Sequence, residues 1–238
     1  MPNTFDFYLA GELFDAKHLT GNAHLAAEIL DQSDGRFRPV IPQDLEQRSL
    51  HPHDIRDDDI LALAECDLAL FHFDGLELDS GTVVEFMIAK FMDIPAVILR
   101  SDFRSSGDQV DHPWNLMASF YPRAEVVLVD ALRSYKFSDK PARKGSRDLI
   151  TDPRRSIDHA VQLTHMIARK VITAFDRVIR IPPLLRDSQE QAVYEWMKTM
   201  CGFKRSRSEI EAVLARDCER RRKRFPSIDD SSHEATRR

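Results

Sequence analysis

The residues of this chain best suited to chemistry are two carboxylates in a short turn near its middle. Asp79 and Glu85 lie six positions apart, on either side of residues 80–82. The turn follows an apolar run at Leu68–Phe73 and opens a second apolar stretch with helical spacing, so it joins a buried strand to a helix. α/β proteins place their chemistry at such turns. The pair is suited to cleaving a glycosidic bond, with one carboxylate as nucleophile and the other binding the sugar or moving protons.

Glu85 also has a purely structural interpretation. Thr82, followed three positions later by Glu85, has the form of a capping box, in which the threonine caps the helix and the glutamate binds back to the cap amide. Asp79 and Gly81 are likewise common in ordinary turns. On this segment alone, the helix cap and the catalytic pair remain alternatives.

Five short apolar runs predict β-strands, and helical patterns lie between most of them. The strands are expected at Phe5–Ala10, Arg38–Ile41, Leu68–Phe73, Ala96–Arg100 and Val126–Val129, and the helices at Asn22–Leu30, Asp54–Glu65 and Thr82–Met92. This alternation predicts an α/β fold with a parallel sheet covered on both faces. Five strands favour a flavodoxin-like, Rossmann-like three-layer arrangement, in which the first and third strands are neighbours. The crevice above their C-terminal ends then holds Gly11 and the turn that carries Asp79.

The character of the sequence changes after about residue 131, so we divide the chain into a catalytic domain over 1–131 and a helical extension over 132–238. Residues 134–152 predict a linker, and residues 226–238 predict a disordered end. Helices are expected at Ser156–Ile179, Ser188–Met200 and Ser206–Phe225. The first of them is amphipathic, with an apolar stripe that must pack on its own sheet or on a partner. The last contains five consecutive basic residues, which we expect to be solvated.

Composition restricts the class of protein. The chain has 238 residues, of which 42% are hydrophobic, enough for a substantial core. It has no apolar stretch of the about 18 residues that a transmembrane helix needs, and its start lacks the pattern of a signal peptide. The three cysteines are scattered, which favours a reduced, cytoplasmic protein without disulfides.

Charge is distributed unevenly along the chain. Residues 1–130 carry a net charge of −15 and residues 131–238 a net charge of +10, within a total of −5. An acidic catalytic half is a poor surface for nucleic acid. An acidic half and a basic half in one chain favour contacts between subunits, so we expect a homo-oligomer.

Other motifs argue against a cofactor or a metal. Gly75 and Gly81 do not form a dinucleotide-binding or phosphate-binding loop. His51 and His53 lie in a proline-containing loop before a helix, where solvated histidines are more common than metal ligands. His72, on the third expected strand, either lines the pocket or is a satisfied core histidine, and the second interpretation is favoured.

Several segments over residues 5–130, taken together and in order, resemble the nucleoside 2-deoxyribosyltransferase family. They are Phe7-Tyr8-Leu9-Ala10-Gly11 with Leu13-Phe14, Ile41-Pro42-Gln43-Asp44, Cys66-Asp67, Asp79-Ser80-Gly81-Thr82-Val83-Val84-Glu85 and Pro113-Trp114-Asn115-Leu116-Met117. The extension lies outside the resemblance. The resemblance implies an enzyme that needs no cofactor or metal and acts on 2′-deoxyribonucleosides and free nucleobases.

The resemblance also implies roles for individual residues. Glu85 matches the nucleophile that attacks the anomeric carbon, and Asp79 matches the aspartate that contacts the sugar hydroxyls. Asp59 matches an aspartate that exchanges a proton with the nucleobase, and Tyr8 matches a tyrosine that steadies the nucleophile. Asn115 matches an asparagine that, in such proteins, can reach a neighbouring subunit's site. The remaining residues assigned to substrate binding are Gly11, Phe14, Glu46, Ser80 and Gly81.

The implied reaction is a double displacement through a covalent ester on Glu85, with net retention. Two departures leave base preference and pocket shape open, because Glu46 stands where some relatives have glutamine, and Phe86 follows the nucleophile where many have glycine. Two other functions remain. A deoxynucleoside 5′-monophosphate N-glycosidase needs a phosphate cradle, where this chain has the acidic Glu12 instead. A nucleoside-binding regulatory protein would bind the ligand without turnover.

Overall fold

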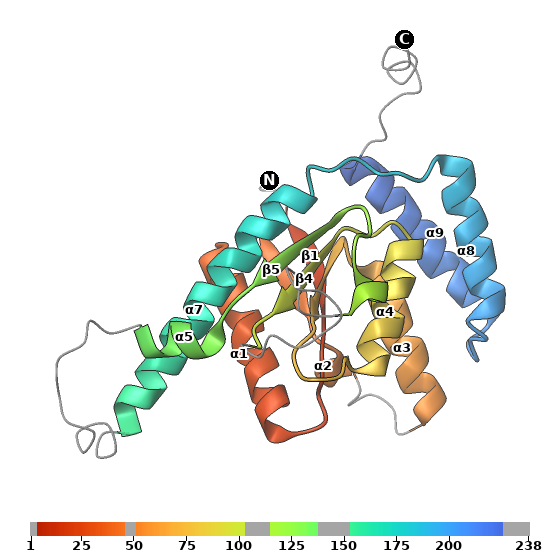
Figure 1. The fold of residues 1–238 in the computed structure, drawn as a ribbon. Helices are drawn as coiled ribbons and strands as arrows, with labels where there is room; N and C mark the ends of the chain where they lie inside the picture. Colours follow the sequence, from red (N-terminus) through yellow and green to blue (C-terminus); the bar gives the residue numbers. More distant parts are fainter. Residues whose placement is uncertain (1–3, 46–50, 103–114, 138–152, 226–238) are drawn as a thin grey trace, which may run out of the picture.

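The computed structural model describes residues 4–45, 51–102, 115–137 and 153–225. At its centre lies a parallel sheet with helices on both faces (Figure 1). Its five strands are β1 (Phe5–Ala10), β2 (Phe37–Val40), β3 (Leu68–His72), β4 (Ala96–Arg100) and β5 (Ala124–Leu128). Their order in the sheet is β2-β1-β3-β4-β5, which is the flavodoxin-like order that the sequence predicts. The predicted fold class is therefore confirmed.

The neighbouring strands β1 and β3 carry the chain to opposite faces of the sheet. The register pairs Tyr8 with Ala69 and Ala10 with Phe71. After β1 the chain forms α1 (Ala16–Gln32) on one face, and after β3 it forms α4 (Ser80–Phe91) on the other. Such a reversal opens a crevice above the C-terminal ends of the two strands.

The face of the sheet that α4 covers also carries α3 (Pro52–Glu65) and the two last helices. The short helix α2 (Pro42–Leu45) contacts α3, and the 3-10 turn η2 (Leu116–Ala118) contacts α4. Helices α8 (Asp187–Met200) and α9 (Arg207–Arg224) contribute buried side chains to the same apolar cluster. Figure 1 shows α8 and α9 beside α3 and α4 on this side of the molecule.

The opposite face is covered by α1 together with α7 (Pro153–Val178), as Figure 1 shows. The apolar stripe of α7 is buried at Ile167, Val171 and Phe175, whereas Ile157 near the start of the helix is 63% exposed. Because α7 contacts β4 and β5, it completes the layer that α1 begins. The amphipathic helix therefore packs on its own sheet. The division of the chain at residue 131 stays a prediction, although α7 shares a core with the N-terminal half.

The expected linker begins with a helix instead. Helix α5 covers Ala131–Phe137 and contacts α7, so the prediction of a linker is wrong for residues 134–137. The hydroxyl of Tyr135 donates a hydrogen bond to the carbonyl oxygen of Ser156 at 3.1 Å, and its ring packs edge-on against His159. These contacts hold α5 on α7. Residues 138–152 and the expected disordered end at 226–238 lie outside the described residues.

At the basic end of α9, Arg222 and Lys223 are exposed as predicted, whereas the prediction of solvated side chains is wrong for Arg220, Arg221 and Arg224. Arg221 is only 5% exposed, and its Nη1 donates to the carbonyl oxygen of Ala64 at 2.8 Å. Arg220 and Arg224 both form ion pairs with Asp67, whose side chain is fully buried. Buried carboxylates and free carbonyls at the N-terminal edge of the sheet supply acceptors for these guanidinium groups.

All three cysteines are free thiols. None of the helices in the described part of the chain is long and apolar enough to cross a membrane.

Asp217 is a fully buried carboxylate of α9, and its burial raises its pKa to about 6. The positive charges of Arg220 and Arg216 lower this pKa, whereas Glu65 and Asp67 raise it further. The ordinary pKa of the carboxyl group is 3.8, so the folded protein holds a proton that the unfolded chain releases. The free energy of unfolding therefore falls as the pH rises from about 4 to about 6.

Asp217→Asn is expected to raise the free energy of unfolding by about 1–3 kcal/mol above pH 6, and to leave it unchanged below about pH 4. The amide does not ionise, so this part of the pH dependence disappears. Urea denaturation of both proteins between pH 4 and pH 8 measures the effect. Asp158→Asn, at an exposed position of α7, is the matched control. Equal slopes of stability against pH in the wild-type and Asp217→Asn proteins would contradict the prediction.

Candidate active site

Two of the predicted catalytic residues, Tyr8 and Glu85, are in direct contact although they lie 77 positions apart. Tyr8 is fully buried on β1, and its hydroxyl donates a hydrogen bond to Oε1 of Glu85 at 2.7 Å. Glu85 lies in the second turn of α4 and is half-buried. The contact forms because β1 and β3 are neighbours and α4 follows β3.

The surroundings of Tyr8 include a second carboxylate. Burial, followed by the negative charges of Glu85 and Asp59, raises the pKa of Tyr8 well above its ordinary value. The phenol therefore stays protonated and acts as a hydrogen-bond donor. Asp59 lies on helix α3, and its charge acts on the phenol of Tyr8.

The fourth predicted catalytic residue, Asp79, caps α4. Its Oδ2 accepts hydrogen bonds from the Thr82 backbone N–H at 2.7 Å and from the Thr82 hydroxyl at 2.8 Å. The helix therefore begins at Ser80, and the alternative of a capping box between Thr82 and Glu85 is wrong. Aspartate is preferred over threonine at the N-cap, so the earlier residue defines the start of the helix. Glu85 then lies within the helix, with Oε1 bound to Tyr8.

Two glycines of the site are required by the close approach of other groups. A Cβ atom at Gly81 would lie 3.2 Å from Oδ2 of Asp79, the oxygen that caps α4. A Cβ atom at Gly11, directly after β1, would lie 3.2 Å from Cβ of His72 at the end of β3. A larger side chain at either position would displace the turns that hold the site.

The loop between β3 and Asp79 is fixed by two residues that sequence reasoning missed, Asp74 and Arg100. Arg100 is buried at the end of β4, and its guanidinium donates to the carbonyl oxygens of Phe73 at 2.7 Å and Gly75 at 3.2 Å. Asp74 accepts hydrogen bonds from the backbone N–H of Ser101 at 2.5 Å and of the next residue at 3.0 Å. In the sequence, the feature that pointed to this role was Arg100 itself, a charged residue at the end of an otherwise apolar strand.

The carboxyl group of Asp74 has a lowered pKa. Its burial opposes ionisation, but the hydrogen bonds and charge of His72 and the hydrogen bonds from Ser101 outweigh burial and hold the pKa of Asp74 well below its ordinary value. Nε2 of His72 lies 2.9 Å from Oδ2 of Asp74. Asp74 is therefore a permanent anion that ties the end of β3 to the end of β4.

A cavity of about 510 Å³ lies at this edge of the sheet, on the face that α1 and α7 cover. Its polar lining includes Glu12, Lys17, Asn22, His72, Asp74 and Ser101, and none of the four predicted catalytic residues lines it. The volume falls within the range of about 300–1,000 Å³ that is usual for small-molecule sites. His72, for which the sequence favoured a core position, is half-buried and lines this cavity.

The other residues that the resemblance assigns to the substrate are placed as follows. Phe14 is 76% exposed, and Ser80 and Gly81 are exposed at the start of α4. Asn115 caps η2, because its Oδ1 accepts a hydrogen bond at 2.8 Å from the backbone N–H two residues later. Glu46 lies outside the described residues.

The half of the chain that holds Tyr8, Asp59, Asp79 and Glu85 also carries a family match. Residues 7–117 match the model of the nucleoside 2-deoxyribosyltransferase family. The resemblance predicted from the sequence is therefore confirmed over the N-terminal half of the chain. None of the curated proteins matches the chain.

Solved structures with similar folds include three that cover about half of this chain. A conserved protein from Enterococcus faecalis V583 is 28% identical, with a TM-score of 0.40, and the match covers 44% of this chain and 68% of that one. A 2-deoxyribosyltransferase from Leishmania mexicana is 19% identical, with a TM-score of 0.42 and coverages of 51% and 89%. A 2-deoxyribosyltransferase from Bacillus psychrosaccharolyticus is 15% identical, with a TM-score of 0.34 and coverages of 40% and 72%. These TM-scores are all below 0.5, so the likeness to the deoxyribosyltransferase family rests on the match over residues 7–117.

Proposed function

We propose that this chain is an enzyme that transfers 2-deoxyribose between nucleobases through a covalent ester on Glu85. The observation that carries the proposal is the 2.7 Å hydrogen bond from the buried Tyr8 to Glu85, in the part of the chain that matches the deoxyribosyltransferase family. A buried phenol that stays protonated holds one carboxylate oxygen of Glu85 in a fixed position through this hydrogen bond. An ionised, oriented carboxylate is what a nucleophile for the anomeric carbon requires.

In the proposed reaction, Glu85 attacks the anomeric carbon as the bond to the first nucleobase breaks. Deoxyribose lacks the electron-withdrawing 2′-hydroxyl, so positive charge develops easily on the sugar, and the nearby carboxylate stabilises that charge. The carboxylate then captures the sugar as an ester. A second base attacks from the side that the first base left, and the two inversions give net retention.

The two other carboxylates have separate proposed roles. Asp59 exchanges a proton with the leaving and entering nucleobase, a role supported by the action of its charge on Tyr8. Asp79 contacts the sugar hydroxyls. Its Oδ2 is held by Thr82, so we propose that Oδ1 is the oxygen that binds the sugar.

Incubation of the protein with deoxyinosine and either adenine or cytosine tests this function. We expect a new deoxynucleoside together with free hypoxanthine, and slow release of hypoxanthine when no acceptor base is present. Deoxyinosine 5′-monophosphate is expected to be the poorer donor, because the residue that follows Gly11 directly after β1 is the acidic Glu12, which does not form a phosphate cradle and repels a phosphate group. Faster cleavage of the monophosphate supports the N-glycosidase instead, and binding of deoxyinosine without turnover supports a regulatory protein.

Tyr8→Phe is expected to lower kcat/KM by about 10- to 100-fold, because it removes a hydrogen bond to a charged group. The substitution preserves the shape of the buried ring, so the fold is retained. Steady-state kinetics with deoxyinosine and adenine, alongside circular dichroism, measure both effects. An unchanged kcat/KM in a folded variant would show that Tyr8 does not support the nucleophile.

We also propose that the protein is a homo-oligomer in which Asn115 lies near a neighbouring subunit's site. Support comes from exposed apolar residues close to Asn115: Met117 is 76% exposed and Phe120 is 77% exposed. Such a surface is costly to leave in water. Light scattering should therefore give a mass that is a multiple of 27.4 kDa. An active monomer would reject a shared site.

A further inference from the structure

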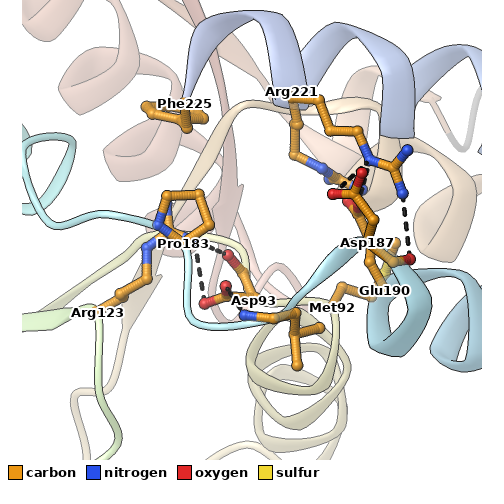
Figure 2. Close-up of a pocket in the computed structure, with 10 residues that line it drawn as sticks. Met92, Asp93, Arg123, Pro183, Asp187, Glu190, Arg221 and Phe225 are labelled. Atoms are coloured by element: carbon orange, nitrogen blue, oxygen red, sulfur yellow. Dashed lines mark hydrogen bonds and ion pairs between the residues drawn. The ribbon is translucent and has the colours of Figure 1, made fainter. Parts of the chain in front are cut away.

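A second cavity, of about 370 Å³, lies at the N-terminal edge of the sheet, the edge away from the C-terminal strand ends that hold the candidate active site. It is enclosed by the end of α4, the segment before β5, the connection from α7 to α8, and the basic end of α9. Figure 2 shows Arg123 and Asp93 on one side of this cavity and Arg221, Asp187 and Glu190 on the other. The cavity therefore lies between the C-terminal helices and the sheet.

Among the described residues, Arg221 forms no ion pair within 4.0 Å, although the negative charges of Glu190 and Asp67 act on it. Its side chain is buried, with an exposed fraction of 5%. Its Nη1 donates a hydrogen bond to the carbonyl oxygen of Ala64 at 2.8 Å. Its Nε and Nη2 have no hydrogen-bond acceptor in the described part of the chain. Burial lowers the pKa of Arg221 to about 10, so the guanidinium is charged at neutral pH.

Arg123 has the same open edge. It is 4% exposed, and its Nη1 donates to the backbone oxygen of Asp93 at 2.5 Å and pairs with Oδ1 of Asp93 at 3.0 Å. Within the described residues, Nε and Nη2 of Arg123 also have no acceptor. Nε–H and one Nη–H on the same side of a guanidinium form the edge that binds two oxygens of one oxyanion. A buried N–H without an acceptor is energetically costly. In both arginines, a bound group that supplies acceptor oxygens to this edge would remove that cost.

The carboxylates that line the cavity are occupied by other arginines. Nε of Arg222 lies 2.8 Å from Glu190 and 3.5 Å from Asp187, and Asp93 pairs with Arg123. Asp93 additionally accepts hydrogen bonds through Oδ2 from the backbone N–H groups of residues 184 and 185. Arg222 is thus one cation shared by Glu190 and Asp187, and the charge of Glu190 also acts on Arg221. The three carboxylates and the three arginines of the lining balance in charge, so the cavity is distinguished by the open guanidinium edges of Arg221 and Arg123 and not by an excess of positive charge.

We propose that this cavity binds a small oxyanion, a phosphate or carboxylate group on a metabolite-sized molecule, through the open guanidinium edges of Arg221 and Arg123. Its volume lies at the lower end of the range of about 300–1,000 Å³ for small-molecule sites. Arginine is the residue best suited to bidentate recognition of both groups. Because the bound anion connects α9 with the segment before β5, it stabilises the packing of the C-terminal helices on the sheet.

Thermal unfolding of the full-length protein tests the proposal. Inorganic phosphate and malonate are added separately at constant ionic strength, with sodium chloride as the balance. A ligand at ten times its dissociation constant is expected to raise Tm by about 3–6 °C, and Tm is expected to rise further with the logarithm of the ligand concentration. A response to phosphate alone assigns a phosphate site, and a response to malonate alone assigns a carboxylate site. A Tm that neither anion changes overturns the proposal.

Three variants locate the site. Arg221→Gln is expected to weaken binding at least tenfold, whereas Glu190→Gln is expected to tighten it severalfold by removing a negative charge from the lining. Arg216→Gln, which changes a largely exposed arginine that pairs with Glu65, is the matched control and leaves the affinity unchanged. If Arg221→Gln does not fold, Glu190→Gln decides alone, and an unchanged affinity in that variant overturns the proposal. The response to phosphate is expected to persist in Glu85→Gln, so this test is independent of the transferase reaction.

Discussion

Glu85→Gln is expected to lower the rate of deoxyribose transfer by about 10³-fold or more, the effect of losing a covalent nucleophile. The glutamine has the same shape, and its carbonyl oxygen can still accept the Tyr8 hydrogen bond. Its amide cannot form the glycosyl ester, and it carries no negative charge to stabilise the developing positive charge on the sugar. The measurement is steady-state transfer from deoxyinosine to adenine.

The fold provides a clear control for this substitution. The cap of α4 is formed by Asp79 and Thr82, so Glu85→Gln leaves the start of the helix intact and is expected to change the free energy of unfolding by less than about 1 kcal/mol. Glu77→Gln changes an exposed glutamate in the loop before α4 and is the matched control for activity. Near-normal turnover in a folded Glu85→Gln variant would remove Glu85 from the role of nucleophile.

Asp59→Asn is expected to slow cleavage by about 10²- to 10⁴-fold for nucleosides with poor leaving groups, and by much less for those with good leaving groups. A base that leaves readily needs little protonation, so the loss of a proton donor affects it least. Single-turnover cleavage of a series of deoxynucleosides, with bases of graded leaving ability, measures this dependence.

Asp58→Asn is the matched control for Asp59→Asn, because Asp58 is the adjacent carboxylate on α3 and forms an ion pair with Arg205. Its activity is expected to stay close to that of the wild-type protein. An equal loss for every leaving group in Asp59→Asn would mean that Asp59 orients the substrate and does not transfer a proton.

The order of the sheet could be predicted from the sequence because apolar strands and helical patterns alternate so regularly. Element boundaries were less accurate, for physical reasons. Strand β5 begins at Ala124, two residues before the apolar run, because backbone pairing with β4 needs no apolar side chain. Helix α1 begins at Ala16, because Asp15 caps it through the backbone N–H groups of Lys17 and His18. Its first turns are largely exposed and therefore lack an apolar pattern.

The candidate site likewise has features that the sequence could predict and features that it could not. The carboxylate turn was visible in the sequence, but its pairing with Tyr8 followed only from the family resemblance, since the two residues lie 77 positions apart. The contacts of Arg100 and Arg221 could not be predicted, because their acceptors are backbone carbonyls of distant segments. A sequence pattern reports which side chains are polar, and it carries no record of which distant carbonyl will accept their hydrogen bonds.

The most direct test of a glycosyl ester on Glu85 is to trap it. A 2-fluoro analogue of the deoxynucleoside slows breakdown of the ester by withdrawing electrons from the sugar, so the covalent intermediate accumulates. Peptide mass spectrometry of the treated wild-type protein is expected to find the fluorosugar on the peptide that contains Glu85, and to find none in Glu85→Gln. A sugar adduct on another residue, or turnover of the analogue without any adduct, would contradict the proposed mechanism.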